Sequence, residues 1–274
     1  MSALVPAPLQ PKLAALLALL PSSIPSPLKY AALCLLLLNC QHFPGVWHAR
    51  IIWPWIKFQW QVKLGKRWPN TRIGKDPLDF RLSRSFRATP DSCDSFGMHL
   101  SNSEYAVSVD HVRGPFAIQL VGEFYQLEKA SFALGATSYV FKKEIPLMAK
   151  FTVTSELLGY DKKWLYIQTR FHSPDDKTTY AYCLSHVVLK HKRRTIPPAR
   201  AFALAGYGAD GAANWAIVQT LNAHEKLQWL IGEGEGEGEG EGEGEGEGEK
   251  KGRAIRVAGA ERAMEGKGEW PGQL

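Results

Sequence analysis

The chain has 274 residues, of which 45% are hydrophobic and 22% are charged, and its net charge is +6. This composition is typical of a folded protein with one sizeable core, and it excludes a collagen-like chain, a disulfide-dense secreted scaffold and a wholly disordered chain. The charge is unevenly distributed, because residues 1–231 carry a net charge of +12 and residues 232–274 carry a net charge of −6.

The first 75 residues form a basic arm that we expect to associate with a membrane. This arm holds nine basic residues and no acidic one, and Asp76 is the first carboxylate of the chain. Two apolar runs, 13–20 and 30–38, are each shorter than the ~20 residues that cross a bilayer as a helix. Basic residues alternate with tryptophans after these runs, as in an interfacial anchor. The tryptophans are Trp47, Trp53, Trp55, Trp60 and Trp68.

Three other interpretations of the arm remain open. It could be a helical lid on the folded part, a secretory signal peptide or a site for single-stranded nucleic acid. Only Lys12 precedes the first apolar run, and no clean cleavage site follows it, so a signal peptide is disfavoured. No nucleic-acid motif is present, so we expect no nucleic-acid partner. Cys34 and Cys40 are candidates for acylation or buried thiols, and the globular part is expected to face the cytosol.

Residues 76–207 are predicted to form one α+β domain. Leu78–Arg87 alternates apolar and polar residues and predicts a half-buried strand. A helix capped by Ser101 or Asn102 is predicted from about residue 103 to residue 126, and Gly114-Pro115 is expected to kink or restart it. Its apolar face is Tyr105, Val109, Val112, Phe116, Leu120 and Phe124.

Four strand-like runs separated by turn signals follow the helix. One strand, one long apolar helix and then a meander of long strands predict an antiparallel sheet wrapped around a central helix. The runs are Phe132–Glu144, Lys150–Leu158, Lys163–His172 and Thr178–Lys190.

The end of the chain is predicted to add little to the fold. Residues 206–211 match G-x-G-x-x-G, but the chain lacks the βαβ context of a dinucleotide site, so we interpret them as a flexible surface loop. The segment 208–231 is predicted to be a loop and a helix over 215–230. Residues 232–249 are nine Gly-Glu pairs, and the tail 232–274 is expected to be disordered because it has too few apolar residues to form a core.

The segment PDSCDSFGMHLSNSEYAVSVDHVR, residues 90–113, resembles the strand-to-helix signature of the hotdog-fold thioesterase-like superfamily. The subgroup is the 4-hydroxybenzoyl-CoA thioesterase-like proteins, whose motif is roughly Asp-x-Asp, Gly, His, Asn-Asn, two residues and Tyr. The later segments FALGATSYVFKKEIPLMAKFTV, GYDKKWLYIQTRF and KRRTIPPARAF are similar to fungal and membrane-anchored animal members. The resemblance covers about residues 76–207. It implies a hotdog homodimer that hydrolyses CoA-linked or carrier-linked acyl thioesters without a metal or redox cofactor.

Five residues fall on conserved positions of the family motif, and two positions depart from it. Ser92 stands where the family has its first Asp, and Ser101 stands where it has its first Asn. The Asp-to-His gap is also one residue longer than in many relatives. The matching residues are Asp94, Gly97, His99, Asn102 and Tyr105, on the second Asp, the Gly, the His, the second Asn and the Tyr.

Thioester hydrolysis needs a carboxylate that activates water or attacks the carbonyl, together with donors for the developing oxyanion. The resemblance assigns the carboxylate to Asp94, and backbone N–H groups from Gly97 to Ser103 are expected to be the donors. Asn102 would hold the loop or orient water. The other interpretation is that Asp94 and Asn102 are only turn and capping residues. Substrate contacts are expected from Gly97, Ser101, Ser103 and Tyr105.

Two alternative functions remain open, and the first of them uses the same residues. The spacing of Asp94 and His99 also matches hotdog hydratases and dehydratases, in which His is a general base. The continuation through Tyr105 favours the thioesterase-like branch. A non-catalytic acyl-binding or lipid-binding protein held at a membrane is the second alternative, because a fold does not fix an activity.

Overall fold

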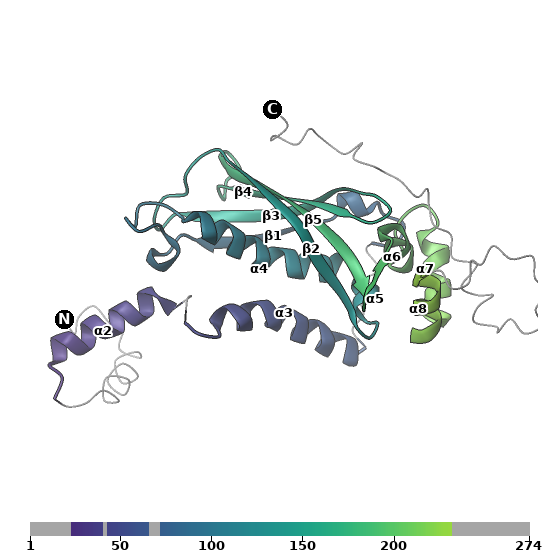
Figure 1. Ribbon diagram of the computed structural model, residues 1–274, viewed down its shortest axis with the longest axis horizontal. Coiled ribbons are helices and arrows are strands. Elements are labelled where there is room, and N and C mark those ends of the chain that lie inside the picture. Colours follow the sequence, from purple (N-terminus) through teal and green to yellow (C-terminus); the bar gives the residue numbers. More distant parts are fainter. Residues whose placement is uncertain (1–22, 41–42, 66–71, 232–274) are drawn as a thin grey trace, which may run out of the picture.

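The computed structural model describes residues 23–40, 43–65 and 72–231 (Figure 1). Three features of the sequence lie outside the described residues, namely the first apolar run at 13–20, Trp68 and the Gly-Glu tail at 232–274.

The body of the protein is one antiparallel sheet with the order β1-β3-β4-β5-β2, and a short β6 pairs with β5. The four predicted runs correspond to β2–β5. Sequence patterning missed β6, whose three residues are too few to show a period. The strands are β1 (Arg81–Arg87), β2 (Ala130–Phe141), β3 (Lys150–Tyr160), β4 (Leu165–His172), β5 (Thr179–His191) and β6 (Arg194–Ile196).

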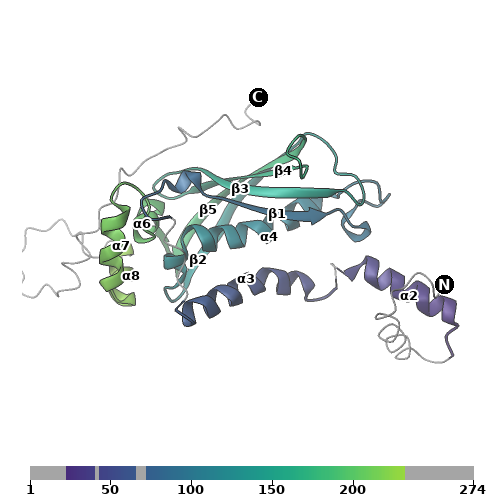
Figure 2. The same cartoon turned by 180° about the vertical axis from the view of Figure 1, so that it is seen from behind.

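The sheet curls around helix α4 (Asn102–Leu120), which is followed by α5 (Gly122–Tyr125) (Figures 1 and 2). This is the α+β hotdog arrangement that the resemblance implies. The helix does not restart at Gly114-Pro115, because α4 continues through Pro115 and ends at Leu120. Pro115 has no N–H for the carbonyl of His111, one turn earlier. Nη1 of Arg84 donates a hydrogen bond to that carbonyl instead, at 3.2 Å.

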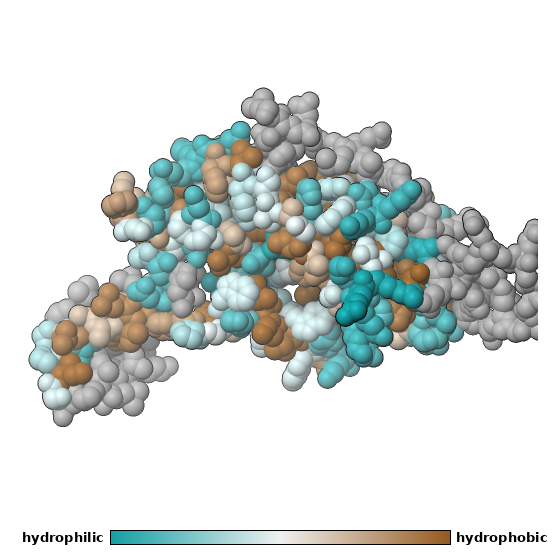
Figure 3. All heavy atoms as spheres, in the orientation of Figure 1, coloured by the Kyte–Doolittle hydropathy of each residue, from teal (hydrophilic) through white to brown (hydrophobic). Residues whose placement is uncertain are grey.

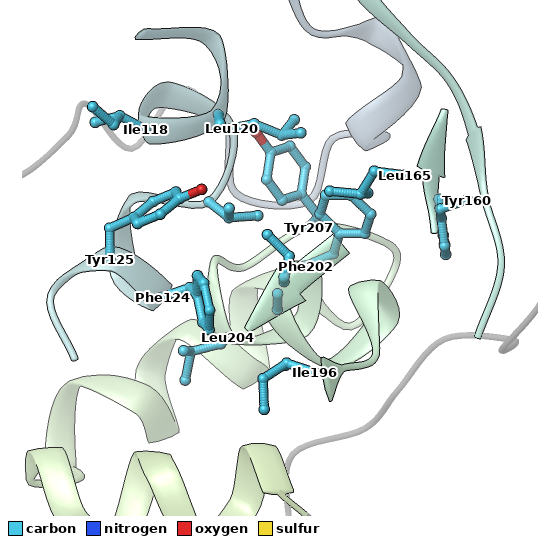
Figure 4. Close-up of a cluster of buried hydrophobic side chains, with 14 of the residues drawn as sticks. Ile118, Leu120, Phe124, Tyr125, Tyr160, Leu165, Ile196, Phe202, Leu204 and Tyr207 are labelled. Carbon is cyan, nitrogen blue, oxygen red and sulfur yellow. The ribbon is translucent and has the colours of Figure 1, made fainter. Parts of the chain in front are cut away.

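The predicted apolar face of α4 is confirmed, since its five residues and Phe124 of α5 are all at most 3% exposed. Aromatic and aliphatic side chains from α5, β3, β4 and the C-terminal helices converge on the end of α4 (Figure 4). Tyr160 and Phe202, for example, contact each other edge to face with ring centroids 4.9 Å apart. A second cluster surrounds the start of α4, so the helix is packed along its whole length.

Two helices precede the sheet, α2 (Ser26–Leu38) and α3 (Val46–Lys63). Helix α3 runs beside α4 on the side away from the sheet (Figures 1 and 2). It buries Phe58, which is 2% exposed, in the main core. Within the described ranges, no helix is long and apolar enough to span a bilayer. Cys34 and Cys40 are exposed, so the expectation that they are buried thiols is wrong.

Three helices close the fold, α6 (Pro198–Leu204), α7 (Gly211–Thr220) and α8 (Ala223–Ile231). The single helix predicted over 215–230 is therefore two helices, and Leu221 is extended between them. The G-x-G-x-x-G segment is a turn that is hydrogen-bonded to Gly74 and Lys75 rather than a flexible loop. The carbonyl of Gly206 accepts from the N–H of Gly74 at 2.9 Å, and the N–H of Gly208 donates to Lys75 at 2.9 Å.

Candidate active site

The motif forms a tight loop between the short helical turn at Pro90–Ser92 and the start of α4. Cys93 and Leu100 close the loop with an antiparallel bridge. Inside it, the N–H of Asp94 donates to the carbonyl of His99 at 2.9 Å. Gly97 lies at the tip with a φ of +65°, a conformation that residues with a side chain rarely adopt. Its N–H donates to the backbone carbonyl of Asp94 at 2.8 Å.

The carboxylate of Asp94 is held by the backbone of its own loop. Oδ1 accepts from the N–H of Met98 at 2.8 Å and from that of His99 at 3.4 Å. The Met98 N–H is the main cause that lowers the pKa of Asp94 below its usual value. The N–H of Phe96 contributes in the same direction. Asp94 is therefore ionised at neutral pH. Because the hydrogen bonds from Met98 and His99 both reach Oδ1, Oδ2 is the oxygen expected to meet a water molecule or a substrate.

Most of the backbone donors expected between residues 97 and 103 are already used inside the protein. The N–H of Leu100 donates to the carbonyl of Ile145 at 2.9 Å, and the N–H of Ser101 donates to the carbonyl of Ser92 at 3.0 Å. The N–H groups of Asn102 and Ser103 have no acceptor among the described residues, and both residues are exposed at the first turn of α4. The expected set of oxyanion donors is therefore reduced to these two.

The other motif side chains are less directly placed for catalysis. His99 Nε2 lies 3.5 Å from Glu144, and its Nδ1 is buried without a hydrogen bond in the described structure. Its ring makes no hydrogen bond to the carboxylate of Asp94. Ser101 occupies the N-cap of α4, and its hydroxyl contacts that of Ser103 at 3.0 Å.

Tyr105 belongs to the core. It is 3% exposed, and its ring lies 5.0 Å from that of Phe141 and 4.9 Å from that of Phe171. Burial raises the pKa of its hydroxyl to about 12. The structure thus gives Tyr105 a packing position under the loop rather than a position on an open pocket wall.

The loop is surrounded by exposed apolar side chains. Phe96 is 86% exposed and Met98 is 70% exposed. The carbonyl of Met98 accepts from the N–H of Leu147 at 3.0 Å, which brings a second exposed pair, Leu147 and Met148, to the same edge. An ionised carboxylate among uncovered apolar side chains is suited to a ligand with an acyl chain or to a second protein surface.

A polar cluster that sequence reasoning missed lies between the middle of α4 and the sheet. Arg113 is 7% exposed, contacts Asp110 on the same helix and donates to the hydroxyl of Ser185 at 3.2 Å. Burial raises the pKa of Asp110. Tyr139 and Cys183 lie next to this cluster, and burial raises the pKa of both. The only sequence signal for this cluster is the pair Asp110 and Arg113, which are three residues apart within an otherwise apolar helix.

Residues 88–206 match the family model of the thioesterase-like superfamily, which confirms the resemblance read from the motif. A thioesterase of Purpureocillium lilacinum is 27% identical over 208 residues, which are 61% of this chain and 67% of the relative. A protein of Saccharomyces cerevisiae named as a probable thioesterase is 31% identical over 122 residues, 43% of this chain and about half, 52%, of the relative.

Solved structures of similar proteins include a hypothetical protein of Staphylococcus aureus in complex with CoA. It is 16% identical, has a TM-score of 0.40, and the alignment covers 52% of this chain and 85% of that chain. A probable thioesterase of Bartonella henselae is 10% identical with a TM-score of 0.37, and covers 43% of this chain and 98% of that chain.

Proposed function

Because residues 88–206 carry the thioesterase-like domain of this superfamily, we propose that the protein hydrolyses acyl thioesters of CoA or of a carrier protein at a membrane surface. The observation that carries the proposal is the carboxylate of Asp94, which is ionised and is oriented at Oδ1 by the N–H groups of Met98 and His99. It is the group that the reaction needs, and apolar side chains that suit an acyl chain surround it.

In the proposed reaction Asp94 acts as general base. Oδ2 takes a proton from a water molecule while the water oxygen bonds to the thioester carbon. The C–S bond of the tetrahedral intermediate then breaks. The leaving sulfur takes the proton that Asp94 holds, so the products are a free thiol and a carboxylic acid, and Asp94 is ionised again.

The negative charge of the intermediate would meet the N–H groups of Asn102 and Ser103. Both point out of the first turn of α4, where the helix dipole adds partial positive charge. Asn102 therefore contributes through its backbone, in addition to the side-chain role implied by the family motif.

We further propose that two copies pair through β2. This twelve-residue strand is one edge of the described sheet, and Leu134 and Phe141 on it are 44% and 47% exposed. An exposed long edge strand is a template for pairing. Phe141 contacts Tyr105, and Glu144 just beyond β2 contacts His99. A partner on β2 would therefore lie beside the motif loop and cover its apolar side chains.

The membrane location rests on the N-terminal helices. Leu35, Leu36 and Leu37 of α2 are more than half exposed. Trp53 and Trp60 of α3 are 64% and 66% exposed, and hydrophobic residues gather on the visible face of this arm (Figure 3). Exposed indoles beside lysines and arginines favour the headgroup region of a membrane, with the globular domain on the cytosolic side.

The proposal is tested by a thioester hydrolysis assay on the full chain and on Asp94→Ala, with acyl-CoA substrates of several chain lengths. We expect wild type to turn over and Asp94→Ala to lose at least about a hundredfold in rate. Equal turnover by both proteins would refute the role of Asp94. Binding of acyl-CoA without turnover by wild type would instead establish the acyl-binding alternative.

A further inference from the structure

A groove runs between α3 and the side of α4 that faces away from the sheet. It consists of two adjoining hollows with volumes of about 340 and 470 Å³, which share Trp53, Pro54 and Arg84 as walls. These volumes are in the range of small-ligand sites. The groove contains no residue of the Asp94 loop, so it is separate from the candidate active site.

The groove is strongly cationic. Arg50 and Lys57 of α3 and Arg84 of β1 line it, and none of the residues that line either hollow is acidic. Arg50 and Arg84 line the same hollow. Burial is the main cause that lowers the pKa of Arg84, and the charge of Arg50 lowers it further. An anion bound between α3 and β1 would be attracted by both positive charges.

A buried polar atom at the base of the groove also has no partner. His111 of α4 lines the larger hollow and is 4% exposed. Its Nδ1 is inaccessible and makes no hydrogen bond in the described structure. The ring stacks on Phe86 with centroids 6.5 Å apart, which fixes its plane. The imidazole therefore forms a fixed part of the wall of the larger hollow.

The rim of the groove is apolar. Val46, Ala49, Trp53 and Pro54 line it beside the cations. This rim continues into the outer face of α3, where Ile52 and Ile56 are 48% and 40% exposed. A water-soluble phosphate compound would gain nothing from such a rim, whereas the chains of a lipid would bury it.

We propose that the groove between α3 and α4 binds the phosphate headgroup of an anionic phospholipid, with Arg50, Lys57 and Arg84 on the phosphate and the acyl chains along the outer face of α3. Phosphate suits a site with two guanidinium groups, which donate paired hydrogen bonds to it. This site goes beyond thioester hydrolysis, because it gives α3 a specific lipid partner rather than a general attraction to the membrane.

The test compares two full-length double variants that remove the same charge. Arg50→Gln/Lys57→Gln removes two cations from the groove. Lys63→Gln/Arg81→Gln removes two exposed cations outside it, one on α3 and one on β1. Arg84 is left intact because it also supports α4. Co-sedimentation is measured with phosphatidylcholine vesicles that contain or lack phosphatidic acid, and thermal unfolding confirms that both variants fold.

We expect the groove variant to bind the acidic vesicles at least about tenfold more weakly than the control variant. Equal losses in the two variants would overturn the proposal, because diffuse charge would then explain the binding. Calorimetric titration with soluble short-chain phosphatidic acid, inorganic phosphate and CoA identifies the source of the phosphate. The short-chain lipid should bind best, and equal or tighter binding of inorganic phosphate or CoA would overturn the lipid assignment.

The inference is separable from the proposed activity. Asp94→Ala should bind acidic vesicles like wild type, even though it loses hydrolysis. Loss of hydrolysis with normal vesicle binding in Asp94→Ala supports both proposals. Wild type that hydrolyses thioesters but binds vesicles equally with and without phosphatidic acid would refute only the lipid site in the groove.

Discussion

Nη1 of Arg84 on β1 donates a hydrogen bond to the carbonyl oxygen of His111 on α4 at 3.2 Å. Pro115 leaves this carbonyl without its helical N–H partner. Arg84 of the sheet thus donates the hydrogen bond that the helix cannot form at this carbonyl. This contact explains how α4 continues through a proline.

Arg84→Met should destabilise the protein by about 1–3 kcal/mol, because it leaves a buried carbonyl without a donor. The same change in a Pro115→Ala background should cost less, since an alanine in place of the proline would restore the helical N–H to the carbonyl of His111. Urea unfolding of the four proteins in this double-mutant cycle measures the difference. Equal costs in both backgrounds would show that Arg84 acts through packing alone.

The stability of the fold should fall in mild acid because of His111. Burial and then the charges of Arg50 and Arg84 lower its pKa from 6.5 to about 4. The unfolded chain binds this proton at the higher pH, so the contribution is fully present above pH 6.5 and is lost as the pH falls toward 4. It amounts to at most about 3 kcal/mol. His111→Gln should flatten urea-unfolding stability across this window, and an unchanged slope would exclude His111 as its source.

Gly211 should tolerate no side chain. A Cβ at this position would lie 2.0 Å from the carbonyl oxygen of Gly206 and 2.6 Å from the backbone N of Gly74. Gly211→Ala should therefore cost about 1–3 kcal/mol and lower the melting temperature by several degrees. Ala212→Ser, at the exposed next residue of α7, serves as the control. An unchanged melting temperature of Gly211→Ala would mean that Gly211 is not held close to Gly206 and Gly74.

The sequence was sufficient to predict the sheet and the central helix because periodicity reports burial directly. The face from Tyr105 to Phe124 is apolar at helical spacing, and β2–β5 are long runs between turn signals. The failures concern contacts between segments distant in sequence. The hydrogen bond from Arg84 to His111 that carries α4 past Pro115 joins residues 27 apart and leaves no local pattern.

The candidate site was predictable in identity but not in detail. The motif pointed to Asp94 and to the start of α4, whereas the backbone hydrogen bonds decide which N–H groups remain open to a substrate. At the first turn of α4, the N–H groups of Asn102 and Ser103 donate to no acceptor among the described residues. The burial of Tyr105 depends on Phe141 and Phe171 from two strands, so its packing role could not be read from one motif.

The pH profile of hydrolysis should identify the base. The Met98 N–H lowers the pKa of Asp94, so its carboxylate remains ionised to below about pH 4, the usual value for Asp. The acidic limb of kcat/KM should therefore lie at or below that pH, measured where the protein is folded. A midpoint well above that pH would exclude Asp94 as the base and would favour the hydratase-like arrangement.

The backbone N–H of Asn102 can be removed without disturbing α4. Asn102 is the first helical residue, a position where proline is accepted, and Ser101 before it has φ −68° and ψ 150°, which proline requires of its neighbour. If this N–H stabilises the oxyanion, Asn102→Pro should lower kcat by about 10²–10³-fold with little change in KM or melting temperature. Asn102→Ala separates the side chain from the backbone, and we expect it to retain more activity than the proline variant. Equal losses in the two variants would assign the effect to the side chain, and full activity of Asn102→Pro would remove this N–H from the mechanism.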